Sequence, residues 1–133
     1  MAPGNAPAAA QPSHANLAAA GLRTFFNIAR EWGLKDVEAQ RLLAVPATTY
    51  KRWKRSPERA TLDQDKLERL SYILGIYKAL EILLPNAERA TGWVRRPNSA
   101  PPFAGAAPLQ RMLSGQVADL FVVRNWLDAQ RSH

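Results

Sequence analysis

The sequence contains no cysteine and only two histidines, His14 and His133, which lie near its two ends. The lack of cysteine excludes a disulfide framework, a thiolate nucleophile and a cysteine-based metal site. Two histidines at opposite ends argue against a catalytic triad and against a histidine-based metal site. We therefore expect a protein that binds no cofactor and catalyses no reaction.

Long hydrophobic runs are also lacking, because no apolar stretch approaches the about 20 residues that span a membrane. Residues 1–15 carry no lysine or arginine and none of the apolar sequence typical of a signal peptide. This stretch is rich in alanine and proline, and we interpret it as a disordered leader. A soluble cytosolic protein is expected.

Positive charge, by contrast, is abundant and unevenly placed. The 133 residues include 18 Lys+Arg and 11 Asp+Glu, for a formal net charge of +7. Residues 1–60 hold nine basic and four acidic residues, and residues 61–133 hold nine and seven, so the halves carry +5 and +2. Between residues 51 and 59 five basic residues accompany one acid, Glu58. This cluster favours a polyanionic partner.

Hydrophobic spacing predicts an all-α protein of about seven helices. We expect them at about residues 17–32, 36–44, 46–55, 61–84, 86–94, 108–114 and 116–131. Asn16 is the expected N-cap of the first helix, and a Thr61–Gln64 capping box is expected to open the long one. Leu17, Val37 and Phe121 are assigned to buried faces.

Residues 36–55 fit a helix-turn-helix, in which two short helices are joined by the tight turn Ala44-Val45-Pro46. In such a unit the second helix enters the major groove, with small polar residues at base edges and flanking cations at phosphates. Tyr50 and Trp53 share one face and are interpreted as core residues that anchor this helix. The candidate DNA-binding residues are Thr48, Thr49, Lys51, Arg52, Lys54 and Arg55.

The C-terminal half shows no catalytic constellation. Asp119 and Asp128 are nine residues apart on one expected helix and do not share a face, and there is no glycine-rich phosphate loop. Tryptophan, phenylalanine and proline gather instead around residues 97–108. This density indicates either a small core or a partner-binding surface, and Trp93 and Trp126 are assigned to a core by default. Phe103, between Pro102 and Ala104, is the better candidate for an aromatic anchor that contacts a partner.

This half resembles the toxin-binding domain of the Xre/MbcA/ParS antitoxin family. The matching residues are Trp93-Val94, Pro97-Asn98, Phe103-x-Gly105, Pro108-Leu109, Met112, Gly115, Val123-Arg124 and Trp126-Leu127-Asp128. Thr49-Tyr50 and Arg52-Trp53 of the helix-turn-helix are also similar, so the resemblance covers about residues 18–131. Phenylalanine before glycine and the closing Arg/Asp/Arg series look like antitoxins that are paired with RES-domain toxins.

The resemblance implies a type II antitoxin. Its parts would be a leader at residues 1–15, a helix-turn-helix domain for DNA binding and dimerisation at 16–60, and a toxin-binding domain at 61–133. RES-domain toxins degrade NAD⁺, and the antitoxin occludes their active-site cleft. The implied partners are this toxin, the promoter DNA of its own operon and a second copy of the chain, with no membrane.

The resemblance also assigns toxin-binding roles to particular residues. Phe103 and Gly105 would shape the loop that contacts the toxin. Arg124, Asp128 and Arg131 would line one side of the last helix and reach into the toxin's cleft. Three alternatives stay open: a stand-alone transcriptional regulator, an antitoxin of a ParT-like ADP-ribosyltransferase toxin, and an enzyme.

Overall fold

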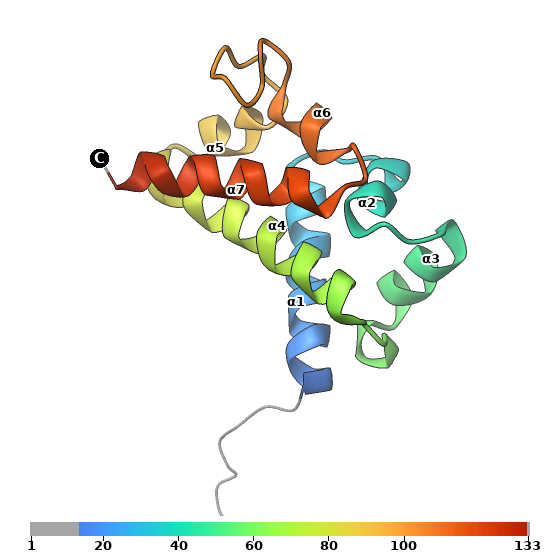
Figure 1. Ribbon diagram of the computed structural model, residues 1–133. Coiled ribbons are helices and arrows are strands. Elements are labelled where there is room, and N and C mark those ends of the chain that lie inside the picture. Colours follow the sequence, from blue (N-terminus) through green and yellow to red (C-terminus); the bar gives the residue numbers. More distant parts are fainter. Residues whose placement is uncertain (1–13, 133) are drawn as a thin grey trace, which may run out of the picture.

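The computed structural model describes residues 14–132, and within this range every regular element is a helix, which confirms the predicted all-α class (Figure 1). A single 3-10 helix, η1 (Pro57–Arg59), precedes the longest α-helix. The α-helices are α1 (His14–Glu31), α2 (Asp36–Leu43), α3 (Ala47–Arg55), α4 (Gln64–Leu83), α5 (Ala87–Trp93), α6 (Pro108–Met112) and α7 (Val117–Arg131).

Helix α4 lies at the centre of the molecule, because several other helices pack against it. Helix α7 packs along one side of α4, α1 crosses another side, and α5 contacts α4 near its C-terminal end (Figure 1). The buried apolar residues of α4 are Leu70, Ile73, Ile76, Ala79 and Leu80.

One hydrophobic core runs through both halves of the sequence. It joins Phe25 of α1 and Leu42 of α2 to Met112 of α6 and Leu127 of α7, all of which are at most 1% exposed. Burying one such side chain contributes about 1.5–3 kcal/mol to folding. The helix-turn-helix and the C-terminal helices therefore share one core around α4 and do not have separate ones.

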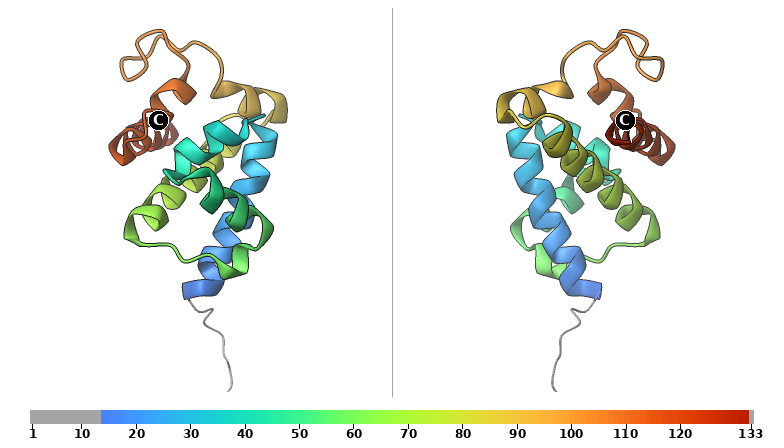
Figure 2. Two further views of the ribbon diagram at one scale, coloured as in Figure 1. Left: turned by 90° about the vertical axis from the view of Figure 1, so that its right-hand side faces the viewer. Right: turned by 90° about the vertical axis from the view of Figure 1, so that its left-hand side faces the viewer.

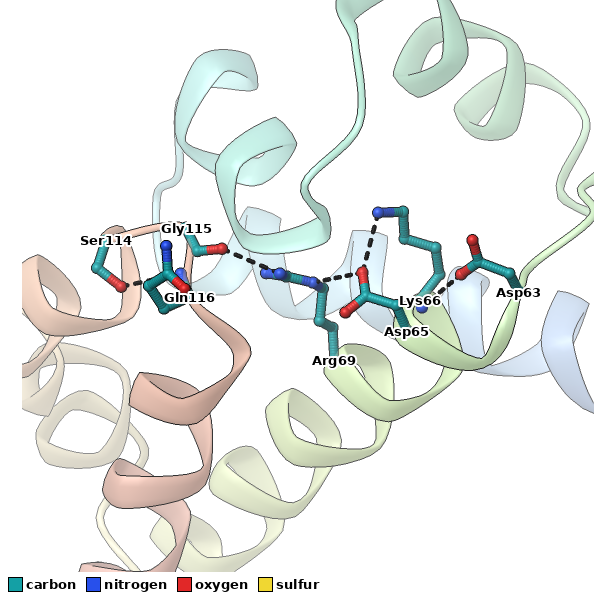
Figure 3. A network of polar contacts seen from close by, with 7 residues as sticks. All are labelled: Asp63, Asp65, Lys66, Arg69, Ser114, Gly115 and Gln116. Atoms are coloured by element: carbon teal, nitrogen blue, oxygen red, sulfur yellow. Dashed lines mark hydrogen bonds and ion pairs between the residues drawn. The ribbon is translucent and has the colours of Figure 1, made fainter.

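Two arginines add polar links between elements that are distant in the sequence. Arg69 of α4 is 8% exposed; its Nε donates to Asp65 Oδ2 and its Nη2 to the carbonyl oxygen of Gly115, both at 2.9 Å (Figure 3). Arg95, which follows α5, donates to the carbonyl oxygens of Trp32 and Gly33 at 2.9 and 2.7 Å. Arg69 thus joins α4 to the α6–α7 turn, and Arg95 joins the segment after α5 to the end of α1.

The ends of two helices differ from the predictions. Helix α1 begins at His14, so Asn16 lies inside the helix and is not its N-cap. Helix α4 begins at Gln64, and the side chain of Asp63 accepts the Lys66 N–H at 3.0 Å, so the cap is Asp63 and not Thr61. Both threonine and aspartate are good N-caps, and the sequence pattern does not distinguish two candidates two residues apart.

Three apolar residues assigned to buried faces are exposed instead: Leu17 by 57%, Val37 by 58% and Phe121 by 49%. Helical periodicity identifies an apolar stripe, but the width of the stripe that is covered depends on the neighbouring element. The predicted disordered leader lies, except for its last two residues, outside the described residues; His14 and Ala15 belong to α1.

Candidate DNA-binding and toxin-binding surfaces

Helix α3 is held on the molecule by two aromatic residues. Tyr50 and Trp53 are both buried, as their predicted role as core anchors requires. Phe26 of α1 packs edge-on against Tyr50, with 5.7 Å between the ring centroids. Burial, together with the nearby Asp36 carboxylate, raises the pKa of the Tyr50 hydroxyl to about 12, so Tyr50 stays neutral at physiological pH. The orientation of α3 is therefore set by its apolar side.

The opposite side of α3 carries the predicted DNA-binding residues. Thr49 is half-buried, and the exposed ones are Thr48, Lys51, Arg52, Lys54 and Arg55. Lys54 Nζ lies 3.5 Å from Asp36 Oδ1 and 5.8 Å from the centre of the Tyr50 ring. The other three cations form no ion pair with any residue between 14 and 132. Their charge is not neutralised within this part of the chain, which suits contact with phosphates.

Helix α7 brings the three predicted toxin-binding charges together on one face. Asp128 Oδ2 lies 3.5 Å from Arg124 Nε, and Asp128 Oδ1 lies 3.6 Å from Arg131 Nη1. The three side chains are 36%, 44% and 37% exposed in the order Arg124, Asp128, Arg131. Partly exposed pairs of this kind contribute at most about 1 kcal/mol to stability. This row of charges, the α7 charge ladder, therefore adds little to folding and is open to a partner.

Phe103 is not the exposed anchor that the sequence suggested, because it is only 4% exposed. Its ring stands edge-on to Trp93 and Trp126, with centroids 5.7 and 5.6 Å away, and the two indoles stack at 6.0 Å. These aromatic pairs join the loop at residues 97–107 to α5 and α7. The sequence showed that aromatic residues are dense here and allowed a small core as one interpretation. It did not show that these three rings contact one another, since they lie on three separate elements. The buried Phe103 ring therefore holds the loop against α5 and α7 and is not exposed on the surface.

Gly105 gives the same loop its sharp turn. Its φ is +91° and follows Ala104 at +49°, so two consecutive residues have left-handed backbone conformations. Glycine adopts such angles without steric cost. The Gly105 N–H donates to the Asn98 carbonyl at 2.8 Å, and the Asn98 N–H donates to the Ala106 carbonyl at 3.1 Å. These bonds close the loop, which projects from the end of the molecule opposite the start of α1 (Figure 2).

Comparison with known families finds a match for each part of the chain that carries a candidate surface. Residues 11–75 match the antitoxin Xre-like helix-turn-helix domain, and residues 79–132 match the antitoxin Xre/MbcA/ParS C-terminal toxin-binding domain. The chain belongs to the Xre/MbcA/ParS antitoxin family. It is also similar to an uncharacterized protein, y4oB, of Sinorhizobium fredii, with 47% identity over 113 residues, or 84% of each chain.

The two family matches partition the antitoxin's candidate residues. The helix-turn-helix match contains α2 and α3, and the toxin-binding match contains the α7 charge ladder, Phe103 and Gly105. The matches meet between residues 75 and 79, inside α4. The structural reason is that α4 supplies packing surface to both parts of the antitoxin. The division at residues 60 and 61 stays a prediction.

Two features of the toxin-binding half were missed by sequence reasoning. Phe121, which is 49% exposed, packs edge-on against the half-buried Tyr72 of α4 at 5.8 Å and lies one turn before Arg124, so a partly exposed aromatic pair adjoins the α7 charge ladder. Tyrosine and arginine are enriched at interface hot spots. Arg111 donates to the Pro102 carbonyl at 2.7 Å and to Asp119 at 2.8 Å, which ties the loop to α7. Neither arrangement has a sequence signal, because the partners lie on different elements.

The described part of the antitoxin shows no arrangement suited to metal binding. Between residues 14 and 132, no three histidine or acidic side chains gather closely enough to hold a metal ion. None of the helices in this range has the length and apolar character needed to cross a membrane.

Proposed function

We propose that the antitoxin neutralises a RES-domain toxin, an enzyme that degrades NAD⁺, by covering the toxin's active-site cleft. The α7 charge ladder is the observation that carries this proposal. Arg124, Asp128 and Arg131 share one partly exposed face within the toxin-binding domain, and their ion pairs contribute little to folding. Phe103 and Gly105 support contact with the toxin indirectly, because they shape the loop beside α7.

The test replaces the three ladder residues together with alanine and measures how well the variant stops NAD⁺ loss catalysed by the purified RES-domain toxin. We expect affinity to fall by about 100-fold, which is about 2.7 kcal/mol, because charge-assisted contacts to the partner are removed. The free energy of unfolding should change by no more than about 1 kcal/mol. Unchanged inhibition would exclude the ladder as the toxin-binding site.

The toxin's chemistry is tested in the same experiment. Loss of NAD⁺ without modification of another protein is expected for a RES-domain toxin. ADP-ribosylation of a target protein would instead identify a ParT-like toxin, and the same triple variant would then be assayed against that activity. A toxin-free role as a transcriptional regulator would be supported if the antitoxin bound neither kind of toxin.

We further propose that α3 enters the major groove of promoter DNA and that the antitoxin thereby represses its own operon as a homodimer. The support is the sidedness of α3, with Tyr50 and Trp53 buried and the cations Lys51, Arg52 and Arg55 exposed without ion pairs inside the described range, residues 14–132. A second copy would present a second α3 to an adjacent half-site. Such a repressor acts in the cytosol, where the promoter lies.

The DNA proposal is tested by the salt dependence of promoter binding. Each phosphate contact contributes about 0.9 to the slope of log affinity against log salt. Replacing Lys51, Arg52 and Arg55 with alanine should therefore lower the slope by up to about 2.7. Lys54→Ala should have a smaller effect, since Lys54 is already paired with Asp36. An unchanged slope in the triple variant would refute the role of α3.

The two triple variants serve as controls for each other. Helix α3 and the C-terminal end of α7 lie at opposite edges of the molecule (Figure 1). The α7 variant should therefore bind promoter DNA with wild-type affinity, and the α3 variant should inhibit the toxin fully. Loss of both activities in one variant would indicate misfolding, which its urea unfolding curve would reveal.

A further inference from the structure

Arg124 of the α7 charge ladder lies against a glycine of α4. A β-carbon at Gly75 would come within 2.5 Å of both Cζ and Nε of Arg124 and within 2.6 Å of its Nη1. Real β-carbons essentially never come closer than 3.0 Å to such atoms. The guanidinium therefore occupies space that any other residue at position 75 would fill.

Neither backbone conformation nor core packing explains a glycine at this position. Gly75 lies in the middle of α4, and its φ is not among the positive values. Glycine inside a helix is less favourable than alanine. The three atoms nearest to where the β-carbon would lie all belong to Arg124, whereas a β-carbon at Gly21 would meet the core residue Leu70 at 2.9 Å. The space at Gly75 thus serves one side chain.

The remaining contacts of Arg124 hold its guanidinium in this place. Nη1 donates to the carbonyl oxygen of Ser71 at 3.3 Å, one turn before Gly75, and Nε lies 3.5 Å from Asp128. A carbonyl of α4 and a carboxylate of α7 therefore fix the direction of the guanidinium from two sides. A long side chain that is ordered before binding loses less conformational entropy when the partner arrives.

We propose that Gly75 is a positioning residue for toxin recognition, which holds Arg124 in the orientation in which it meets the toxin. The inference rests on the proposed function of the α7 charge ladder. An alanine at position 75 would displace only the end of a flexible side chain, so the fold would persist while the guanidinium moved off α4. Gly75 itself need not touch the toxin.

A double-mutant cycle tests this role with the purified RES-domain toxin. Toxin affinity is measured by calorimetry for Gly75→Ala, Arg124→Ala and the double variant. We expect Gly75→Ala to weaken binding about tenfold when Arg124 is present and to have no effect when Arg124 is alanine. The urea midpoint of Gly75→Ala should not fall, because alanine favours the helix.

Gly92→Ala is the matched control, because a β-carbon at Gly92 of α5 would also meet a guanidinium, that of Arg96. Arg96 lies outside the ladder, so toxin affinity should be unchanged. An NMR signal of the Arg124 Nε–H in the free antitoxin provides a readout that does not depend on the toxin: it should shift in Gly75→Ala and remain in place in Gly92→Ala.

The outcomes separate this inference from the proposed function. If Arg124→Ala binds the toxin as tightly as wild type, the positioning role of Gly75 is wrong, and the triple ladder variant decides whether the proposed function is wrong as well. If Arg124→Ala binds weakly but Gly75→Ala binds normally, only the positioning role of Gly75 is wrong. The positioning role would also be wrong if Gly75→Ala lowered toxin affinity by the same factor in the Arg124→Ala variant as in wild type, since Gly75 would then act without Arg124.

Discussion

Arg69 offers the sharpest test of how the two family-matched parts of the antitoxin are joined, because it lies in the helix-turn-helix match and Gly115 lies in the toxin-binding match. Its guanidinium bridges Asp65 at the start of α4 and the Gly115 carbonyl between α6 and α7 (Figure 3). The substitution Arg69→Met keeps much of the apolar stem and removes the guanidinium. It therefore isolates the polar bridge from the packing of the side chain.

The expected cost follows from the two lost bonds. Hydrogen bonds to a charged group contribute about 1.5–3 kcal/mol each, and a buried carbonyl without its donor costs about 1–3 kcal/mol. Loss of the Arg69–Asp65 ion pair costs less than loss of a fully buried pair, because the Asp65 side chain is 42% exposed and still has Lys66 Nζ at 3.0 Å. We expect Arg69→Met to lower the free energy of unfolding by about 2–4 kcal/mol.

Urea unfolding followed by tryptophan fluorescence and by circular dichroism measures this loss. Both probes should report one transition in wild type, because a single core joins the halves. Lys66→Met is the control: it also removes a cation from Asp65 but no bond to Gly115, so it should cost less than about 1 kcal/mol. A free energy of unfolding of Arg69→Met within about 0.5 kcal/mol of wild type, or a loss no larger than that of Lys66→Met, would show that this bridge does not join the two parts.

Two further predictions concern stability. Ala44 ends α2 with a φ of +56°, so Ala44→Gly should raise the free energy of unfolding by about 0.5 kcal/mol in the same urea assay, as relief of left-handed strain outweighs the entropy of glycine; a lower midpoint would contradict this. The Ser114 hydroxyl and then Arg111 lower the pKa of Asp119. Its carboxylate therefore stabilises the fold at pH values above the ordinary aspartate pKa of about 3.9, and this stabilisation is lost as the pH falls through the lowered pKa. Between pH 5 and pH 3 the urea midpoint of Asp119→Asn should therefore fall less than that of wild type, and parallel pH profiles would refute the assignment.

Much of the helix-turn-helix could be predicted because the deciding signals are local. The period of 3.6 residues separates Tyr50 and Trp53 from the cations of α3, and the structure confirms this division. The pattern could not show that Lys54 is paired with Asp36, because that contact depends on how α2 and α3 cross. Of the four candidate DNA-binding cations of α3, Lys54 is therefore already paired with Asp36, and Lys51, Arg52 and Arg55 remain without an ion pair between residues 14 and 132.

The aromatic residues of the C-terminal half show where sequence reasoning reached its limit. Phe103 was predicted to face a partner and is buried, whereas Phe121 was predicted to be buried and is exposed. A loop residue becomes buried only if other elements enclose it, and here Trp93 and Trp126 do so from α5 and α7. A helical residue becomes exposed where no neighbour covers its face. Both outcomes depend on contacts between distant segments.

The sequence by itself determined the all-α class, the approximate positions of the helices, the basic character of α3 and the family resemblance, since periodicity and composition act over a few residues. Only the tertiary structure decided which charges are engaged, how the loop at residues 97–107 is held, and that Arg124 lies against Gly75, 49 positions away in the sequence. The physical reason is that α4 is shared. Side chains from both halves pack on its surface, and which of them contact it depends on the three-dimensional arrangement of the helices, which the linear pattern does not contain.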